Sequence, residues 1–430
     1  MNQVVQPAEH LSGMINVPPD KSIAHRSAMF ASLCERGTKS EIDNYSGAAD
    51  PQSTLSCLKQ LGVKIDDHGN NRITVHGVGR NGFSEPRDDL DCGNSGTTMR
   101  LLSGILAGAG IKCRLIGDDS LSKRTMKRII DPLQTMGARI SGAGGNYAPL
   151  QIEPHKGITP IRYPMPLASA QLKSAILLAG LFGEEPTAVI ETVQSRDHTE
   201  RLLDLEIELF GAEKVIRSSV NDKIPAQNYF IPGDFSAASF WLAAGAIHRN
   251  GNIKIPKTGI NPSRIAFLNV LKEMGATVDT QSLKTEGREP AADLSVRSSG
   301  LRPIELNPSL VANCIDELPV LMVVMCFADG KSVITGAEEL RHKETDRLSA
   351  MGNVLASAGV KFNLFKDGIE IFGRPDFRPA PAEYESEHDH RIAMAAAILS
   401  LMSQKSSQIS NAECTRISYP GFWDDLKSLY

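Results

Sequence analysis

The sequence predicts an α/β protein built from a repeated helix–strand unit. In five places a helical stretch ends at a glycine and continues at once into a β-like run, at Gly62, Gly137, Gly211, Gly275 and Gly359. Glycine supplies the left-handed C-cap that ends a helix, and the β-branched or alternating apolar residues that follow suit a strand. The copies lie roughly 65 to 85 residues apart, which indicates duplication of one α/β unit with several units in each domain.

Length and hydropathy favour a multidomain globular protein. The chain has 430 residues, which suggests two or three domains. Hinges are expected at Pro18-Pro19 and at 231–234, because Pro and Gly interrupt regular structure there. The apolar runs Leu318–Ala328 and Ile392–Met402 are shorter than the roughly 20 residues that cross a bilayer. We interpret both runs as buried helices and expect no membrane partner.

Charge and cysteine usage exclude several classes of function. The net charge of -4 argues against a nucleic-acid partner held by a broad basic surface. The seven cysteines include no CxxC pair, which favours free thiols in a reducing cytosol over disulfides or a zinc site. Residues 1–10 contain no apolar stretch of the kind found in signal peptides. We therefore expect a cytoplasmic protein whose locally placed cations bind a small anion.

Six motifs each place a cation, with small polar or glycine neighbours, just before an apolar helical run. A helix N-terminus has unpaired N–H groups and about half a positive charge. An additional Lys or Arg is unfavourable there unless an anion binds in front of the helix. The six motifs, which suggest one large anionic ligand or two ligands, are Asp20-Lys21-Ser22 with Arg26, Gly93–Thr97 with Arg100, Ser169-Ala170-Gln171 with Lys173, Ser195–His198, Lys343–Arg347 and His388–Arg391.

Other interpretations of these and similar motifs are simpler. Gly77–Gly82 matches the dinucleotide-binding pattern GxGxxG, but no helix is expected to start there, so we do not expect it to bind a dinucleotide. Gly330-Lys331-Ser332 resembles the end of a P-loop but lacks the leading glycine, so we do not expect it to bind ATP. His388-Asp389-His390 lacks the spacing of a metal site. Taken singly, the six cationic motifs could be capped helix starts. Asp316-Glu317 could likewise cap the next helix, and Glu344 could form a salt bridge within a helix.

Taken together, the motifs resemble those of the enolpyruvyl transferases. Within that family they are most similar to the enzymes that act on shikimate 3-phosphate. The matching segments run in family order over nearly the whole chain: Asp20–Arg26, Gly93–Thr97, Arg124 within 119–126, Ser169–Gln171, Ser195–Glu200, Asp316-Glu317, Lys343–Leu348 and Asp389–Arg391.

The resemblance implies an α/β fold of two similar domains. Each would contain three repeated α/β units, an inside-out arrangement, with helix N-termini facing an interdomain cleft. It implies that residues 1–20 join 235–430 in one domain and that 21–234 form the other. It further implies a monomer without cofactor or metal.

The implied reaction joins phosphoenolpyruvate to the 5-hydroxyl of shikimate 3-phosphate and releases phosphate. Together the two substrates carry roughly five to six negative charges, counting about -1.5 to -2 for each phosphomonoester. The motifs supply seven cations to meet them: Lys21, Arg26, Arg124, Arg196, Lys343, Arg347 and Arg391.

The resemblance also assigns binding residues. Those implied for shikimate 3-phosphate are Lys21, Ser22, Arg26, Ser169, Ala170 through its backbone, Gln171, Arg196, Asp316 and Lys343. Those implied for phosphoenolpyruvate are Lys21, Asn94, Gly96, Arg124, Gln171, Glu344, Arg347, His390 and Arg391.

Three residues are catalytic candidates. Asp316 is the candidate base toward the 5-hydroxyl, and Glu344 is the candidate proton donor to the enol methylene, with Lys21 as the alternative donor. Many family members carry a Lys near the C-terminus, where this chain has Arg416 as a possible substitute. The family associates a glycine at the Gly96 position with sensitivity to glyphosate, so sensitivity is expected.

Two competing hypotheses differ in testable ways. UDP-N-acetylglucosamine enolpyruvyl transferase shares the fold but has a reactive Cys five positions before an Arg, where this chain has Asp119 before Arg124. A non-catalytic anion-binding homologue would have no need of Asp316 and Glu344, because carboxylates weaken the binding of anions.

Overall fold

The computed structural model describes residues 1–285 and 287–430, and these form two compact units. Unit 1 contains Met1–Pro18, Pro232–Lys284 and Pro290–Tyr430. Unit 2 contains Pro19–Ile231 and Thr285–Glu289. Each unit has its own large apolar core.

Among the described residues, unit 2 contains three sheets of four strands, in the orders β14-β3-β5-β4, β6-β7-β9-β8 and β10-β11-β13-β12. In each sheet one outer pair is parallel and the other two pairs are antiparallel. The same pairing in all three sheets is the structural form of the repeat. The strands are β3 (Lys39–Asp43), β4 (Ile65–Asp67), β5 (Ile73–His76), β6 (Leu90–Asp91), β7 (Cys113–Ile116), β8 (Arg139–Ala143), β9 (Tyr147–Glu153), β10 (Arg162–Pro164), β11 (Thr187–Glu191), β12 (Ile207–Phe210), β13 (Glu213–Ser218) and β14 (Tyr229–Phe230).

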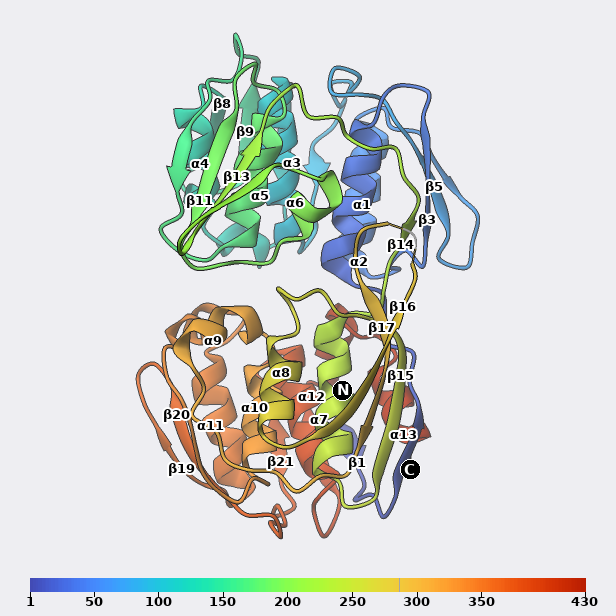
Figure 1. The fold of residues 1–430 in the computed structure, drawn as a ribbon, viewed down its shortest axis with the longest axis vertical. Coiled ribbons are helices and arrows are strands. Elements are labelled where there is room, and N and C mark those ends of the chain that lie inside the picture. The colour runs from blue at the N-terminus through green and yellow to red at the C-terminus, as the bar shows by residue number, and fades with distance from the viewer. Residues whose placement is uncertain (286) are drawn as a thin grey trace. The chain divides into compact units, whose positions relative to one another are not determined.

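Three buried helices form the centre of unit 2. In Figure 1, α1, α3 and α5 occupy the middle of the unit, with β3 and β5 on one side. Every residue of α1 from Ile23 to Leu33 is buried, which explains its apolar and small side chains. The helices are α1 (Lys21–Leu33), α2 (Ala49–Gln60), α3 (Gly96–Ala109), α4 (Lys127–Thr135), α5 (Ala170–Gly180), α6 (His198–Leu203) and the 3₁₀ turn η1 (Leu121–Lys123).

Among the described residues, unit 1 also contains three sheets, ordered β16-β17-β15-β2, β18-β20-β19 and β1-β22-β21, of which the first has the four-strand pairing seen in unit 2. The N-terminal strands β1 and β2 pair here with β22 and β15, so the chain's first residues complete two of its sheets. The strands are β1 (Gln3–Val5), β2 (Leu11–Met14), β15 (Gly251–Gly259), β16 (Thr277–Leu283), β17 (Ala291–Arg297), β18 (Gly330–Ile334), β19 (Lys361–Leu364), β20 (Ile369–Gly373), β21 (Glu383–Glu385) and β22 (Ser407–Ser410).

Apolar helices form the centre of unit 1. Figure 1 shows α7, α10 and α12 in the middle, between β19 and β20 on one side and β15 and β17 on the other. All residues of α10 are buried, as expected for the apolar run that begins at Leu318. The helices are α7 (Phe235–Ile247), α8 (Ala266–Glu273), α9 (Pro308–Cys314), α10 (Leu318–Met325), α11 (Arg347–Ser357), α12 (His390–Ser400) and α13 (Phe422–Ser428), with the 3₁₀ turns η2 (Glu338–His342) and η3 (Ala412–Ile417).

These units confirm the predicted α/β repeat, with one correction. Gly62, Gly137, Gly275 and Gly359 have positive φ angles between 77° and 98° just after α2, α4, α8 and α11. Gly211 does not end a helix, because 207–210 form β12 and Gly211, at φ 60°, lies in the hairpin turn to β13. The preceding helix, α6, ends instead at Asp204 in the left-handed conformation. A left-handed glycine suits a hairpin turn as well as a helix end, so the local pattern misled the prediction.

Among the described residues, no single helix is long and apolar enough to cross a membrane. Within the described part of the chain, α9 and α10 pass this test of length and composition as a pair, but they bend by 119° at their junction.

The contact between α3 and α5 depends on Gly104. A Cβ at this position would lie 2.4 Å from the carbonyl oxygen of Ala175. We expect Gly104→Ala to destabilise the protein by about 1–3 kcal/mol, because backbone atoms must move apart. In the control Gly352→Ala, within α11, the new Cβ would meet no heavy atom closer than 3.5 Å. That change should stabilise the folded protein by about 0.5–1 kcal/mol, because alanine loses less backbone entropy than glycine when the helix forms. Urea unfolding of both variants measures the difference, and a Gly104→Ala midpoint at or above wild type would contradict the close packing.

Candidate functional site

The first cluster of predicted site residues lies at the helix starts of unit 2. Asp20, Ser95 and Ser169 cap α1, α3 and α5, because their side-chain oxygens accept hydrogen bonds from backbone N–H groups of the first turn. The caps satisfy one donor each, so further first-turn N–H groups stay available to an anion. Lys21 follows its cap directly, and Arg26 and Arg100 lie further along α1 and α3. We use the name unit 2 cluster for these helix starts together with the side chains of Lys21, Arg26, Arg100, Arg124 and Arg196.

Arg26 is the most buried cation of the unit 2 cluster, with 3% exposure. Its Nε donates to Thr199 Oγ1 at 2.8 Å and one terminal nitrogen donates to Ser174 Oγ at 3.0 Å. The other terminal nitrogen donates to the carbonyl of Ser22 at 3.0 Å. Burial lowers the pKa of Arg26 to about 10, the Glu200 charge opposes this, and the charge of half-buried Arg196 lowers it further. Arg26 therefore keeps its charge at neutral pH in a fixed orientation.

Gln171 connects the starts of α3 and α5. Its side-chain carbonyl accepts from Arg100 at 2.7 Å, and its amide donates to Thr97 Oγ1 at 3.0 Å. Burial, with the charges of Arg128 and Arg124, lowers the pKa of Arg100 to about 10. Arg100 accompanied one of the sequence motifs but was not among the predicted ligand-binding residues. Only its partners in the folded chain identify it as part of the unit 2 cluster.

Arg124 and Lys21 complete the unit 2 cluster. Arg124 donates to the side-chain oxygen of Asn94 at 2.7 Å and to Ser120 Oγ at 3.1 Å. A Cβ at Gly96 would lie 2.7 Å from an Arg100 nitrogen and 3.7 Å from an Arg124 nitrogen. The glycine at position 96 therefore lets the Arg100 guanidinium lie closer to the backbone than a Cβ would allow, with Arg124 nearby. Lys21 Nζ forms a salt bridge with Asp50 at 3.1 Å.

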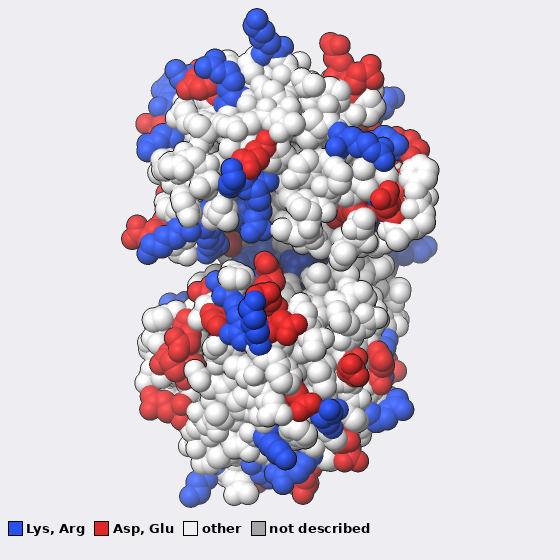
Figure 2. Space-filling model, turned by 90° about the vertical axis from the view of Figure 1, so that its left-hand side faces the viewer, with Lys and Arg blue, Asp and Glu red and all other residues white. Residues whose placement is uncertain are grey.

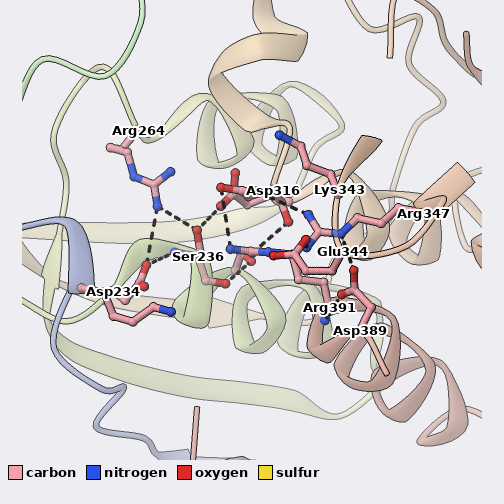
Figure 3. Close-up of polar contacts among 12 residues, drawn as sticks. Asp234, Ser236, Arg264, Asp316, Lys343, Glu344, Arg347, Asp389 and Arg391 are labelled. Atoms are coloured by element: carbon pink, nitrogen blue, oxygen red, sulfur yellow. Dashed lines mark hydrogen bonds and ion pairs between the residues drawn. The ribbon is translucent and has the colours of Figure 1, made fainter. Parts of the chain in front are cut away.

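A second cluster lies at the starts of α10, α11 and α12 in unit 1, and Arg347 is its centre (Figure 3). The Arg347 side chain is 1% exposed and contacts three carboxylates. Its nitrogens lie 2.7 Å from Asp389, 2.6 Å from Glu344 and 3.5 Å from Asp316. Burial lowers the pKa of Arg347, but these three negative charges outweigh it and raise the pKa above its ordinary value. Arg347 is therefore a permanent, oriented cation. We call this set the unit 1 cluster.

Glu344 is held as a carboxylate in this arrangement. Burial raises its pKa, but the Arg347 charge and a backbone hydrogen bond outweigh burial and lower the pKa of Glu344 below its ordinary value. The Asp316 charge opposes that lowering, whereas the Arg391 charge adds to it. As the structure stands, Glu344 accepts protons at low pH only.

Arg391 and Asp316 form the other side of the unit 1 cluster. Arg391 donates from one terminal nitrogen to the backbone carbonyl of Asp316 at 2.9 Å, and the other lies 3.7 Å from the Asp316 carboxylate. His390 is buried at the first position of α12. Lys343 lies at the edge of the cluster, where its Nζ contacts Glu339 at 3.4 Å. The structure thus brings Asp316, Glu344, Arg347 and Arg391 together, as Figure 3 shows.

Sequence reasoning missed a second polar network beside Asp316. Arg264 donates to Ser236 Oγ at 2.7 Å and lies 3.6 Å from Asp234. Ser236 in turn donates to the buried carboxylate of Glu317, the neighbour of Asp316. Figure 3 shows this network next to the unit 1 cluster. The Gly233-Asp234 pair looked like a hinge, and nothing in its local pattern indicates an ion pair.

Other features of the sequence have structural roles. Asp389, from the His388-Asp389-His390 motif, caps α12 and pairs with Arg347. The described residues contain no group of three or more His, Cys, Asp or Glu placed to hold a metal. Arg416 is exposed in η3. Figure 2 shows Lys and Arg interspersed with Asp and Glu over the drawn face of each unit, without one broad basic area.

Comparison with known proteins identifies the family. The family model for EPSP synthase (3-phosphoshikimate 1-carboxyvinyltransferase) matches residues 5–426. A 3-phosphoshikimate 1-carboxyvinyltransferase from Salinibacter ruber is 45% identical over 430 residues, covering 99% of each chain. One from Thermodesulfovibrio yellowstonii is 42% identical and covers 100% of both chains.

Solved structures agree with the sequence comparisons. EPSP synthase from Acinetobacter baumannii superposes with a TM-score of 0.90 at 36% identity, covering 100% of this chain and 98% of that one. The enolpyruvyl transferase NikO from Streptomyces tendae has a TM-score of 0.75 at 16% identity, covering 99% and 96%, and so shares the fold. The predicted inside-out α/β fold and the predicted resemblance are confirmed, and the sugar-nucleotide alternative is not favoured. The chain belongs to the EPSP synthase family of transferases, the 3-phosphoshikimate 1-carboxyvinyltransferases.

Proposed function

We propose how the two clusters share the reaction of this enzyme family. The reaction transfers the enolpyruvyl group of phosphoenolpyruvate to the 5-hydroxyl of shikimate 3-phosphate, with release of phosphate, in the shikimate pathway to aromatic amino acids. The observation that supports this function best is the gathering of oriented, buried cations at capped helix starts in both units, next to two carboxylates. Such sites suit phosphate and carboxylate groups, and both substrates carry both groups.

Shikimate 3-phosphate is assigned to Arg26, Arg196 and the start of α5. The orientation of Arg26 by Thr199, Ser174 and the Ser22 carbonyl supports the assignment, because a guanidinium fixed at three nitrogens presents its remaining donors in set directions. The residues assigned to this substrate are Lys21, Ser22, Arg26, Ser169, Ala170, Gln171, Arg196, Asp316 and Lys343.

Phosphoenolpyruvate is assigned to the cations around Gly96 and to those of the unit 1 cluster. The two guanidinium groups beside Gly96, those of Arg100 and Arg124, support this assignment, since an anion at the start of α3 would meet both of them together with backbone N–H groups. The expected sensitivity to glyphosate rests on the family's association with a glycine at this position. The residues assigned to phosphoenolpyruvate are Lys21, Asn94, Gly96, Arg124, Gln171, Glu344, Arg347, His390 and Arg391, and we add Arg100.

The chemistry needs one proton removed and one supplied. We propose that Asp316 accepts the proton of the 5-hydroxyl while the oxygen attacks C2 of the enol, whose methylene becomes a methyl group. The resulting tetrahedral phospho-ketal then loses phosphate as a methyl proton is removed, which restores the C=C bond. Arginines stabilise the charge on carboxylate and phosphate throughout. The net reaction exchanges one C–O bond at C2 for another, the C–H bond formed at the methyl carbon is broken again, and no oxidation or reduction occurs, so the proposed route uses no cofactor.

Glu344 requires a change of environment before it donates a proton. Arg347 now holds it as a carboxylate. A substrate carboxylate that contacts Arg347 would offset this charge and raise the pKa of Glu344. The binding of phosphoenolpyruvate would thereby prepare the acid, and Lys21 is the alternative donor.

We further propose that the enzyme acts as a monomer in the cytoplasm. Each of the seven cysteines is a buried free thiol, which suits a reducing compartment. The proposed substrates are soluble anions, and all residues assigned to them come from this one chain.

A coupled assay of phosphate release tests the reaction and its specificity. We expect release from phosphoenolpyruvate to require shikimate 3-phosphate and not to occur with UDP-N-acetylglucosamine. Release that depends on the sugar nucleotide, or no release with either acceptor, would overturn the assignment.

Asp316→Ala should lower kcat by about 10²–10⁴-fold, the usual contribution of a general base. Binding of shikimate 3-phosphate alone, measured by calorimetry, should stay within a few-fold of wild type, because the proposed phosphate ligands belong to the unit 2 cluster. The control Asp279→Asn removes the charge of an exposed ion pair in the same unit and should change neither quantity. A turnover near wild type in Asp316→Ala would show that another group is the base.

Glu344→Gln and Lys21→Met distinguish the two candidate proton donors. If Glu344 protonates the methylene, its variant should lose about 10²–10⁴-fold in kcat and lose deuterium incorporation from D₂O into that carbon. Lys21→Met should then mainly raise the KM for phosphoenolpyruvate. The reverse pattern, with exchange retained in Glu344→Gln and abolished in Lys21→Met, would assign the proton to Lys21.

A further inference from the structure

Four charged side chains in unit 2 form a buried network that the reaction does not use. Lys173 Nζ lies 3.0 Å from Glu191 and 2.8 Å from Glu200, and Lys214 Nζ lies 2.9 Å from the same Glu200 oxygen. The side chains of Lys173, Glu191 and Glu200 are 0% exposed and that of Lys214 is 10% exposed. We call these residues the Lys173 network.

Stability alone is a weak explanation for the Lys173 network. Moving a charged group from water into a protein interior costs on the order of several kcal/mol per ion. Replacing a buried ion pair with well-packed apolar residues often leaves the stability unchanged or increases it. The network is nonetheless charge-balanced, with two cations and two carboxylates. Burial raises the pKa of Glu200, but the charges of Lys173 and Lys214 outweigh it and lower the pKa, so Glu200 is ionised at neutral pH.

One ammonium group joins three separate elements. Lys173 belongs to α5, Glu191 ends β11 and Glu200 belongs to α6, and Figure 1 labels all three elements in unit 2. The chain between β11 and α6 carries Ser195 and Arg196. The Lys173 network therefore determines where this segment lies relative to the start of α5.

The contacts continue directly to proposed ligands of the substrate phosphate. Glu191 accepts from both the backbone N–H and the hydroxyl of Ser195, at 3.2 and 2.5 Å, and Ser195 precedes Arg196. Ser174 and Thr199 hold Arg26 at 3.0 and 2.8 Å and contact each other at 2.6 Å. Ser174 follows Lys173 in the chain and Thr199 precedes Glu200, so both supports of Arg26 are neighbours of network members.

We propose that Lys173 is a positioning residue for shikimate 3-phosphate, which through Glu191 and Glu200 sets Arg196 and Arg26 in the geometry that one phosphate requires. The inference rests on the proposed assignment of those two arginines. It explains why a costly buried charge lies behind this part of the unit 2 cluster. Small displacements of binding groups cost up to about 100-fold, so such a support affects binding strongly.

The test removes all four charges while retaining the shapes of the side chains. In Lys173→Met/Glu191→Gln/Glu200→Gln/Lys214→Met two cations and two carboxylates are replaced together, so no charge of the network is left without its partner. We expect the KM for shikimate 3-phosphate to rise about tenfold or more, within the range for misplaced binding groups. The KM for phosphoenolpyruvate should stay within about twofold of wild type. The value of kcat should fall by a smaller factor than kcat/KM for shikimate 3-phosphate.

Two controls separate the possible causes. Arg217→Met/Glu208→Gln removes an ion pair of 2.8 Å between β13 and β12, outside the network, and should change neither KM. Arg196→Met should raise the KM for shikimate 3-phosphate in its own right. If the KM does not rise in Arg196→Met, or if the wild-type enzyme releases no phosphate, the proposed function itself is wrong. Either result can be distinguished from a failure of the Lys173 network alone.

The inference is overturned if the folded four-residue variant keeps the wild-type KM for shikimate 3-phosphate. If that variant does not fold, Glu191→Ala replaces it, since it leaves Lys173 paired with Glu200 and removes the support of Ser195. A several-fold rise in the same KM supports the proposal, and an unchanged KM contradicts it. Unfolding of both variants would show a purely structural role and would also overturn the proposal.

Discussion

Positive charge at the start of buried helices is the constraint on which the rest of this structure depends. Arg26 in the first turns of α1 and Arg347 at the first position of α11 are almost fully removed from water. A helix N-terminus adds its own positive potential, so each arginine is in an environment that opposes it. Carboxylates and hydroxyl groups of the protein offset part of this unfavourable electrostatic energy. The negative charges of the proposed substrates would offset the rest.

The two clusters obtain this compensation differently. Arg347 is surrounded by three carboxylates, which keep it charged, and its own charge in turn keeps Glu344 ionised. Arg26 is oriented by two hydroxyl groups, with negative charge only at longer range from Glu200, Asp20 and Glu289. An arginine among carboxylates links substrate binding to proton transfer, because an incoming anion changes the charge that Glu344 experiences. An arginine held by neutral oxygens keeps its charge and its remaining N–H donors for a phosphate.

The local elements around the site could be predicted from the sequence because their signals are local. Asp20, Ser169, Asp346 and Asp389 are capping residues, and each begins the helix that was expected after it. Gly211 was assigned wrongly because a glycine with positive φ suits both a helix end and a hairpin, and only the pairing of β12 with β13 decides between them. The contribution of Arg100 was missed because its partner Gln171 begins a different helix, 71 residues away in the chain.

By itself the sequence determined the α/β repeat, the family and the cationic helix starts, because caps, glycine helix ends and motif order depend on residues close together in the chain. The tertiary structure alone decided which charges meet. The three carboxylates around Arg347 come from separate segments, and Lys173, which reads as an ordinary lysine near a helix start, joins a strand and a second helix in the interior. Electrostatic energy depends on distance in space and on burial, and neither is encoded in the spacing of residues along a chain.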